Sequence, residues 1–352
     1  MATNSAAIKK TVSELLKDVS QRNRDIISRR FGLKTGKKET LESIGASYGI
    51  TRERVRQIEE STLAQLRSSA SDNTQVNQYI RLAGEIIVDN GGVMKEQDLF
   101  KSFSGREENT VINSGLAFML SLSNELIRFS ANEDFHSFWA RNAATLAAFK
   151  NTTKALITTL EKTGRVVSQE DFNYLASKNN IAGFANTGKP LSESEINLCL
   201  EVSKNLDRNI FNEVGLAAWS DIRPKGVRDK AYLVLKRAKD PRHFSEIAQL
   251  INSMGLGKRK ANVQTVHNEL IKDDRFVLVG RGMYALAEWG YKAGTVKDVL
   301  IDILRNARSP MPKETILAKV RDARLVKENT ILLNLQDSKT FVKNSDGTYT
   351  LK

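Results

Sequence analysis

The sequence has very little of what disulfide-bonded, zinc-binding or membrane-spanning proteins need. Among 352 residues there is a single cysteine, Cys199, so a framework of disulfides within the chain is excluded. The three histidines are not spaced with Cys199 as zinc ligands would be. No apolar run approaches the ~18 residues that cross a bilayer, and residues 1–10 lack the apolar stretch of a secretory signal. We therefore expect a cytoplasmic protein with no membrane contact, metal or cofactor.

Sequence motifs of common enzymes are also missing. The chain contains no Gly-x-Ser-x-Gly, no His-Glu-x-x-His and no dinucleotide-binding fingerprint. Residues 255–258 read Gly-Leu-Gly-Lys and superficially resemble a phosphate-binding loop. However, Asn252 stands where that loop needs its first glycine, and Arg259 stands where it needs Ser or Thr. We therefore expect a protein that is not an enzyme.

What the chain does have is basic charge, concentrated toward its ends. Lys and Arg total 54 against 41 Asp and Glu, which gives a net charge of +13. The net charge is +6 over residues 1–70, −4 over 71–224, +6 over 225–291 and +5 over 292–352. Such an excess of cations favours polyanions such as nucleic acid. DNA contact is therefore expected at the ends, and spacing or protein contact in the middle. A random spread of solvated charge is the alternative.

Residues 33–67 contain the clearest structural motif. Leu41 and Ile44 predict a short helix that packs on a core, Gly49 permits a tight turn, and Thr51 can cap the next helix. In that second helix, one face carries Val55, Ile58 and Leu66, and the opposite face carries Glu53, Arg56 and Gln57. Two helices joined by a short glycine-containing turn, with polar residues at the start of the second, predict a helix-turn-helix.

The polar residues at the start of the second helix are of the types that read bases. Arginine forms a fork to guanine, glutamine pairs with adenine, and glutamate accepts from cytosine. The start of a recognition helix enters the major groove, where those edges lie. Basic residues nearby would then contact phosphates: Arg29, Arg30, Lys34, Lys37 and Lys38. The alternative is a charged helix face that only contacts solvent.

Residues 8–67 resemble region 4 of bacterial sigma factors of the housekeeping, sigma-70, class. The resemblance rests on residues 30–33, 40–45 and 49–59, the last reading Gly-Ile-Thr-Arg-Glu-Arg-Val-Arg-Gln-Ile-Glu. It implies a helix that reads the −35 promoter element and a domain that docks on the flap of the RNA polymerase β subunit. It also implies base contacts for Arg52, Glu53 and Gln57, and a base or backbone contact for Arg56. Nothing in the chain resembles the aromatic-rich region that melts the −10 element.

The rest of the chain repeats a pattern of about three helices followed by a hairpin. Paired apolar runs joined by Gly, Asn or Asp predict hairpins at 126–129 with 138–140, 209–211 with 217–219, 276–279 with 284–286, and 340–342 with 349–351. Three helices and a hairpin form a winged helix, and the repeat indicates an array of such modules. We predict a mainly α fold in which a helix-turn-helix is followed by small winged-helix (α+β) modules. The expected domains are 1–70, 75–142, 143–222, 226–290 and 295–352.

Residues 226–290 resemble the HARE-type winged helix, through 243–248, 263–270 and 275–286. Residues 295–352 resemble it more distantly. Several cations stand beside the third helix and on the wing of the 226–290 module and would suit phosphates: Lys258, Arg259, Lys260 and Arg281. A polar loop without a ligand is an equally open interpretation. Members of this family contact polymerase or chromatin as well as DNA, so both kinds of partner stay open.

Two functional hypotheses fit these observations. The first is a DNA-binding transcription factor related to sigma factors, which recognises a −35-like element and contacts RNA polymerase or flanking DNA through its winged helices. The second is an RNA polymerase-associated or architectural scaffold, in which the sigma-like domain mainly docks on polymerase. Either would work at the bacterial nucleoid, with double-stranded DNA and core RNA polymerase as the expected partners.

Overall fold

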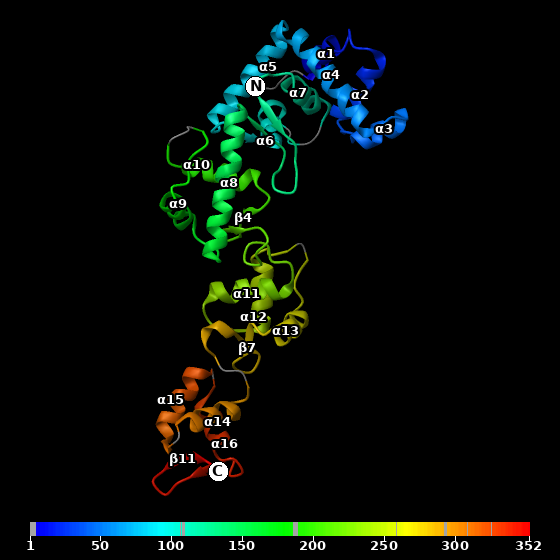
Figure 1. Ribbon diagram of the computed structural model, residues 1–352. Helices are drawn as coiled ribbons and strands as arrows, with labels where there is room; N and C mark the ends of the chain where they lie inside the picture. Colours follow the sequence, from blue (N-terminus) through cyan, green and yellow to red (C-terminus); the bar gives the residue numbers. More distant parts are fainter. Residues whose placement is uncertain are drawn as a thin grey trace. The chain divides into compact units, whose positions relative to one another are not determined.

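The computed structural model describes residues 5–105, 107, 110–185, 189–257, 259–291, 294–307, 309–324 and 326–352. The chain divides into two compact units, Met1–Ala218 and Trp219–Lys352, and each is described by itself (Figure 1). Both units consist mainly of helices with small antiparallel sheets, so the predicted fold class is confirmed. None of the helices in the described ranges combines the length and apolarity needed to span a bilayer.

The first unit begins with four helices: α1 (Ser5–Leu15), α2 (Gln21–Phe31), α3 (Leu41–Tyr48) and α4 (Arg52–Ser71). Gly32 ends α2 at φ 73°, and Gly49 ends α3 at φ 64°, a left-handed conformation that glycine adopts without strain. The Thr51 hydroxyl accepts a hydrogen bond from the Arg54 amide and caps α4. The α3–turn–α4 segment is therefore the helix-turn-helix that the sequence predicts.

After α4 the same order of elements occurs in successive groups. The second group contains α5 (Thr74–Asp89), β1 (Val93–Lys95), α6 (Glu96–Ser104), α7 (Val111–Leu120), β2 (Ile127–Phe129) and β3 (Phe138–Ala140), with sheet order β1-β3-β2. The third contains α8 (Ala143–Thr163), α9 (Gln169–Lys178), α10 (Glu193–Val202), β4 (Leu206–Arg208) and β5 (Val214–Leu216). Three helices followed by a hairpin are thus present in both.

The second unit contains two further groups of this kind. The fourth group has α11 (Val227–Ala238), β6 (Arg242–His243), α12 (Phe244–Ser253), α13 (Val263–Lys272), β7 (Phe276–Leu278), β8 (Met283–Leu286) and the 3-10 helix η1 (Ala287–Trp289). The fifth has α14 (Val296–Ala307), β9 (Met311–Pro312), α15 (Lys313–Ala323), α16 (Glu328–Leu335), β10 (Phe341–Lys343) and β11 (Thr348–Leu351). The sheets have the orders β6-β8-β7 and β10-β11-β9. The predicted domain limits themselves stay predictions.

The hairpin predicted at 209–211 with 217–219 was misplaced by three residues. The strands are β4 and β5, with Leu206 opposite Leu216, and residues 209–213 form the turn between them. The Asn209 side chain accepts hydrogen bonds from the amides of Phe211 (2.9 Å) and Glu213 (3.0 Å), and Asn212 adopts φ 60°. These local bonds favour a turn over a strand. Ile210, which the prediction placed in the strand, is half exposed at the turn.

The second group shares its core with the helix-turn-helix. Helix α7 packs on α1 and α2, and Phe118 lies edge-on to Phe31 with ring centroids 5.3 Å apart. Gly115 allows the close approach to α1, since a β-carbon there would lie 2.8 Å from Ile8 Cγ2. The shared core consists of Ile8, Val12, Leu15, Leu16, Val19, Ile27, Phe31, Leu66, Ala70, Val76, Phe118, Met119 and Leu122. The apolar face of the N-terminal helices is therefore covered by the same chain.

Candidate nucleic-acid interface

The start of α4 presents a polar face above a small apolar core. Ile26, Ile44, Val55 and Ile58 form that core, which fixes the angle between α3 and α4. Four side chains on the outer face are exposed, namely those of Arg52, Glu53, Arg56 and Gln57. The structure thus brings together, on one face of the first two turns of α4, the residues predicted to contact bases. Their contacts with bases stay a prediction.

The four side chains differ in how much of their hydrogen-bonding capacity is free. Arg56 pairs with Glu53 (Arg56 Nη2 to Glu53 Oε1, 2.6 Å) and with Glu60. The hydrogen bond from Arg56 lowers the pKa of Glu53, and Arg54 donates to the Gln57 oxygen at 3.1 Å. Within the described part of the chain, the Arg52 side chain has no hydrogen bond or ion pair. Its guanidinium is therefore free to form a fork to a base edge.

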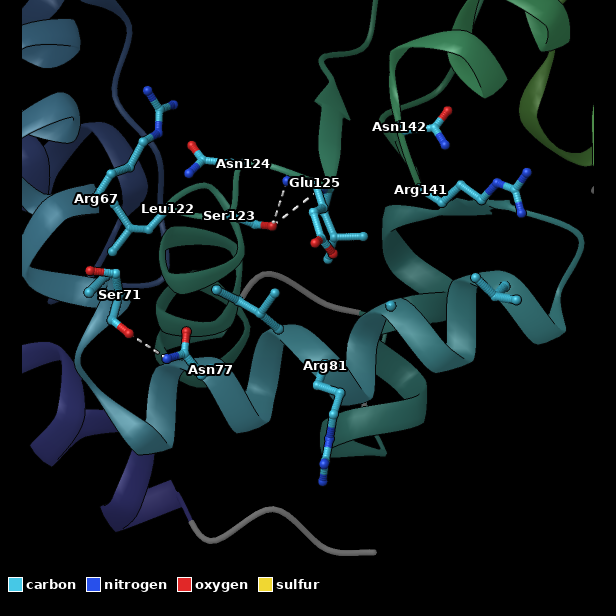
Figure 2. A pocket seen from close by; sticks show the side chains of 15 residues that line it. Arg67, Ser71, Asn77, Arg81, Leu122, Ser123, Asn124, Glu125, Arg141 and Asn142 are labelled. Carbon is cyan, nitrogen blue, oxygen red and sulfur yellow. Dashed lines mark hydrogen bonds between the residues drawn. The ribbon is translucent and has the colours of Figure 1, made fainter.

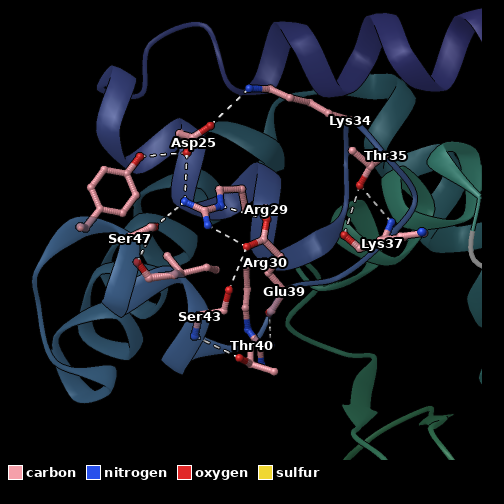
Figure 3. A network of polar contacts seen from close by, with 12 residues as sticks. Asp25, Arg29, Arg30, Lys34, Thr35, Lys37, Glu39, Thr40, Ser43 and Ser47 are labelled. Carbon is pink, nitrogen blue, oxygen red and sulfur yellow. Dashed lines mark hydrogen bonds and ion pairs between the residues drawn. The ribbon is translucent and has the colours of Figure 1, made fainter.

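Arg29 and Arg30 belong to a polar network that braces the helix-turn-helix (Figure 3). Arg29 donates two hydrogen bonds to Glu39 (2.9 and 2.7 Å) and one to the Ser47 hydroxyl at 2.7 Å. Arg30 donates to the Glu59 carboxylate at 3.1 Å. The hydrogen bond from Arg29 lowers the pKa of Glu39. Both arginines thus tie α2 to α3, α4 and the loop before them, and their predicted phosphate contacts would have to be made alongside these bonds.

Lys37 and Lys38, which are adjacent in the sequence, have different environments. Lys37 is exposed and carries no ion pair among the residues that the structure describes. Lys38 reaches the second group, where its Nζ lies 3.1 Å from Glu96 Oε1. Glu96 is only 5% exposed and also accepts two hydrogen bonds from Arg128, one of them at 2.9 Å. Lys37 is therefore available to a phosphate, whereas Lys38 is used in an ion triad with Arg128 around the buried Glu96 carboxylate.

The basic residues predicted in the fourth group lie before α13 and on the hairpin. Arg259 and Lys260 are exposed just before α13, and Arg281 is exposed between β7 and β8. Lys258 lies outside the described residues. Asn262 caps α13 by accepting hydrogen bonds from the amides of Gln264 (2.9 Å) and Thr265 (3.3 Å). No group of three or more potential metal ligands occurs in the described ranges.

Comparison with known proteins assigns two of these segments. Residues 15–68 match sigma-70, region 4. Residues 227–289 match the HARE-HTH domain, the helix-turn-helix domain named after proteins that include ASXL and restriction endonucleases. Both resemblances inferred from the sequence are thereby confirmed, and both matched families are DNA-binding domains. The region-4 segment contains α3, the turn and most of α4, so the exposed start of α4 belongs to a sigma-related helix-turn-helix.

Curated relatives match the same end of the chain. The RNA polymerase sigma factor SigA of Nostoc sp. is 39% identical over 74 residues, which are 21% of this chain and 19% of the relative. The sigma factors SigA of Microcystis aeruginosa and Synechocystis sp. give the same identity over the same length, with 18% and 17% of those proteins covered. The chain thus spans about a fifth of the length of the curated relatives it matches. These matches support a sigma-related, DNA-binding role for the N-terminal segment.

Proposed function

We propose that this protein is a sigma-related transcription factor that recognises a −35-like promoter element through α4. The observation that carries the proposal is the exposed first turn of α4, with Arg52 unpaired, inside a segment that matches sigma-70, region 4. Arginine at the start of a recognition helix can read guanine O6 and N7 in the major groove. Arg56 is already paired with Glu53 and Glu60. It is therefore better placed to orient the Glu53 carboxylate than to give up these ion pairs and contact DNA itself.

The second part of the proposal is association with core RNA polymerase, including its β-subunit flap. An observation on the second group supports a partner other than DNA for the middle of the chain. Residues 113–120 of α7, the third helix of a winged-helix group, are all buried, so that helix cannot enter a DNA groove. The third helix of the next group, α10, carries the exposed acids Glu193 and Glu201. The second and third groups are therefore suited to protein contact and to holding the helix-turn-helix in place.

Replacing Arg52 with alanine tests the base-reading role. The preferred duplex is first selected from a random-sequence library with the full chain. We expect Arg52→Ala to weaken binding to that duplex by about 1–3 kcal/mol and to change binding to random duplex little. Fluorescence anisotropy at fixed salt measures both, and Arg165→Ala, an exposed arginine of the same unit, is the control. Equal losses on selected and random duplex would contradict base reading by Arg52.

The fourth group is proposed to hold DNA through its phosphates without reading sequence. The variant Arg259→Ala, Lys260→Ala, Arg281→Ala should lower affinity about equally for all sequences. Each lost phosphate contact should also reduce the slope of log K against log salt by about 0.9. The control removes three exposed lysines of the acidic middle block, Lys154, Lys162 and Lys178. An unchanged slope in the first variant would assign these cations to a partner other than DNA.

A further inference from the structure

A second candidate binding surface lies at the other end of α4 (Figure 2). A groove of about 710 Å³ is lined by the last turns of α4, by α5, by residues 122–126 after α7, and by Arg141 and Asn142 before α8. Arg67 in this groove is 15 positions beyond Arg52 on the same helix. At 1.5 Å per residue these two positions are about 22 Å apart. The groove is therefore separate from the face proposed to contact bases.

Three arginines from three different segments line this groove. Arg67 comes from α4, Arg81 from α5, and Arg141 from the end of the hairpin. Among the described residues, neither Arg67 nor Arg141 has a carboxylate partner. Their nearest bonds are from Arg67 to the Ser121 carbonyl (3.5 Å) and from Arg141 Nε to the Thr145 hydroxyl (3.1 Å).

The remaining charges in the groove leave it cationic. Arg81 Nε lies 3.7 Å from Glu85 Oε1, and both side chains are well exposed. Such an exposed ion pair contributes little to stability. One acidic residue, Glu125, is part of the lining. The lining thus carries three guanidinium groups against one carboxylate, and with Glu85 beside Arg81 the local net charge is still +1.

The other lining residues indicate the chemistry of the ligand. The amides of Asn77, Asn124 and Asn142 alternate with apolar surface from residues such as Ile80 and the half-exposed Val88. Arginine beside apolar side chains is typical of protein interfaces. The lining contains no aromatic residue, and single-stranded nucleic acid is held largely by aromatic stacking. In Figure 2 the three guanidinium groups lie apart around the groove, with that of Arg81 pointing away from Ser123 and Glu125, and they do not converge on one point, which suits an extended chain better than a single anion.

We propose that this groove binds an extended acidic segment of core RNA polymerase. Carboxylates of that segment would receive forked hydrogen bonds from Arg67, Arg81 and Arg141, the geometry for which arginine is suited. An apolar side chain of the same segment would rest on Val88 and Ile80. The proposal rests on the polymerase half of the proposed function and assigns a surface outside the helix-turn-helix to that contact.

The test uses the full chain and core RNA polymerase purified from the same organism. We expect Arg67→Ala, Arg81→Ala, Arg141→Ala to weaken polymerase binding at least about tenfold. The matching Arg→Lys variant keeps the charge but cannot form the forked hydrogen bonds. Its affinity for polymerase should therefore lie between those of the alanine variant and the wild type. The control with Lys154, Lys162 and Lys178 replaced by alanine changes the net charge equally and should bind polymerase as the wild type does. Affinity of the arginine variant for the selected duplex should be unchanged.

The outcomes separate this proposal from the proposed function. If the wild type binds polymerase and the alanine variant binds equally well, the groove proposal alone is overturned. If the variant instead loses affinity for duplex or single-stranded DNA, the occupant is nucleic acid and the proposal is also overturned. If the wild type does not bind polymerase, the proposed association with polymerase and the groove proposal are both overturned.

Photo-cross-linking identifies the occupant directly. The cross-linking residue p-benzoylphenylalanine is placed at position 88 in the groove, and at position 174 as the control, where Tyr174 is 64% exposed on α9. We expect position 88 to label an acidic stretch of one polymerase subunit, and position 174 not to label it. A position-88 adduct on a basic or wholly apolar stretch would contradict the proposal.

Discussion

Replacing Glu96 with glutamine is expected to destabilise the N-terminal unit by about 3–5 kcal/mol. Glu96 is 5% exposed and is the carboxylate between Lys38 and Arg128. Without its charge, two cations would remain close together in a poorly solvated site, and removing one member of a buried ion pair is costly for that reason. Urea unfolding followed by circular dichroism measures the effect. Lys38 comes after α2, and Glu96 begins α6. Loss of the Glu96 charge should therefore weaken the contact between the helix-turn-helix and the second group.

Two controls separate the buried charge from other effects of the substitution. Glu107→Gln removes a carboxylate of the same group that pairs with Lys101 at 2.6 Å but is about half exposed. That change should leave the midpoint of urea unfolding nearly unchanged, since exposed ion pairs contribute little to stability. The variant Lys38→Met, Glu96→Leu, Arg128→Met removes the whole triad and should restore most of the stability, because buried ion clusters can be replaced by apolar residues at little cost. If the triple variant is also much less stable than the wild type, packing of these side chains, and not the buried charge, accounts for the loss of stability.

The same carboxylate should make the stability of the unit depend on pH. Burial opposes ionisation of Glu96, but the hydrogen bonds and charges of Arg128 and Lys38 outweigh burial and hold its pKa below the ordinary value of 4.5. Its contribution is therefore complete above the unfolded-state pKa and is lost as the pH falls through the lower folded-state pKa. The difference in stability between the wild type and Glu96→Gln should accordingly be largest near neutral pH and shrink in acid.

The helix-turn-helix could be predicted because its determinants are local. The caps at Thr40 and Thr51 accept hydrogen bonds from amides three residues ahead, and Gly49 adopts the left-handed conformation that the turn requires. The hydrophobic spacing of Val55 and Ile58 results from 3.6 residues per turn. Each of these relations spans only a few residues, so the sequence displays it directly.

The partners of the basic residues could not be predicted in the same way. Arg29 pairs with Glu39 ten positions away, Arg30 with Glu59 at 29 positions, and Lys38 with Glu96 at 58 positions. A basic side chain in the sequence looks free for phosphate until the fold brings a carboxylate to it. The acids of the segment, Glu39 and Glu59, were the available signal.

Very short strands could not be predicted, because they too depend on partners that are distant in the sequence. Strands β1, β6 and β9 contain two or three residues each, which is too few for an alternating pattern to show. They form because an antiparallel partner is already present: β1 on β3, β6 on β8 and β9 on β11. Their positions therefore depend on contacts between residues that are distant in the sequence.

Replacing Phe118 with alanine is expected to destabilise the N-terminal unit by about 3–5 kcal/mol, because the side chain is fully buried. Phe118 lies on α7, in the second group, yet its ring packs edge-on against Phe31 of α2, and its core contains residues from α1 and α4 as well. If these helices form one cooperative body, the cavity should weaken the helix-turn-helix as much as the second group.

Hydrogen exchange distinguishes a shared core from two independent ones. In Phe118→Ala the amides of α2 and α4 should lose protection together with those of α7, since all of them open in the same unfolding step. Phe341→Ala removes a buried phenylalanine from the fifth group and should lower protection only within the second unit, Trp219–Lys352. Loss of protection in α7 with α2 and α4 unchanged would show that the helix-turn-helix is stable without its neighbour. In the expected case, a chain that ends after α4 would expose the apolar face that α7 covers. DNA recognition by α4 would then depend on the second group, although the residues proposed to contact bases all lie on α4.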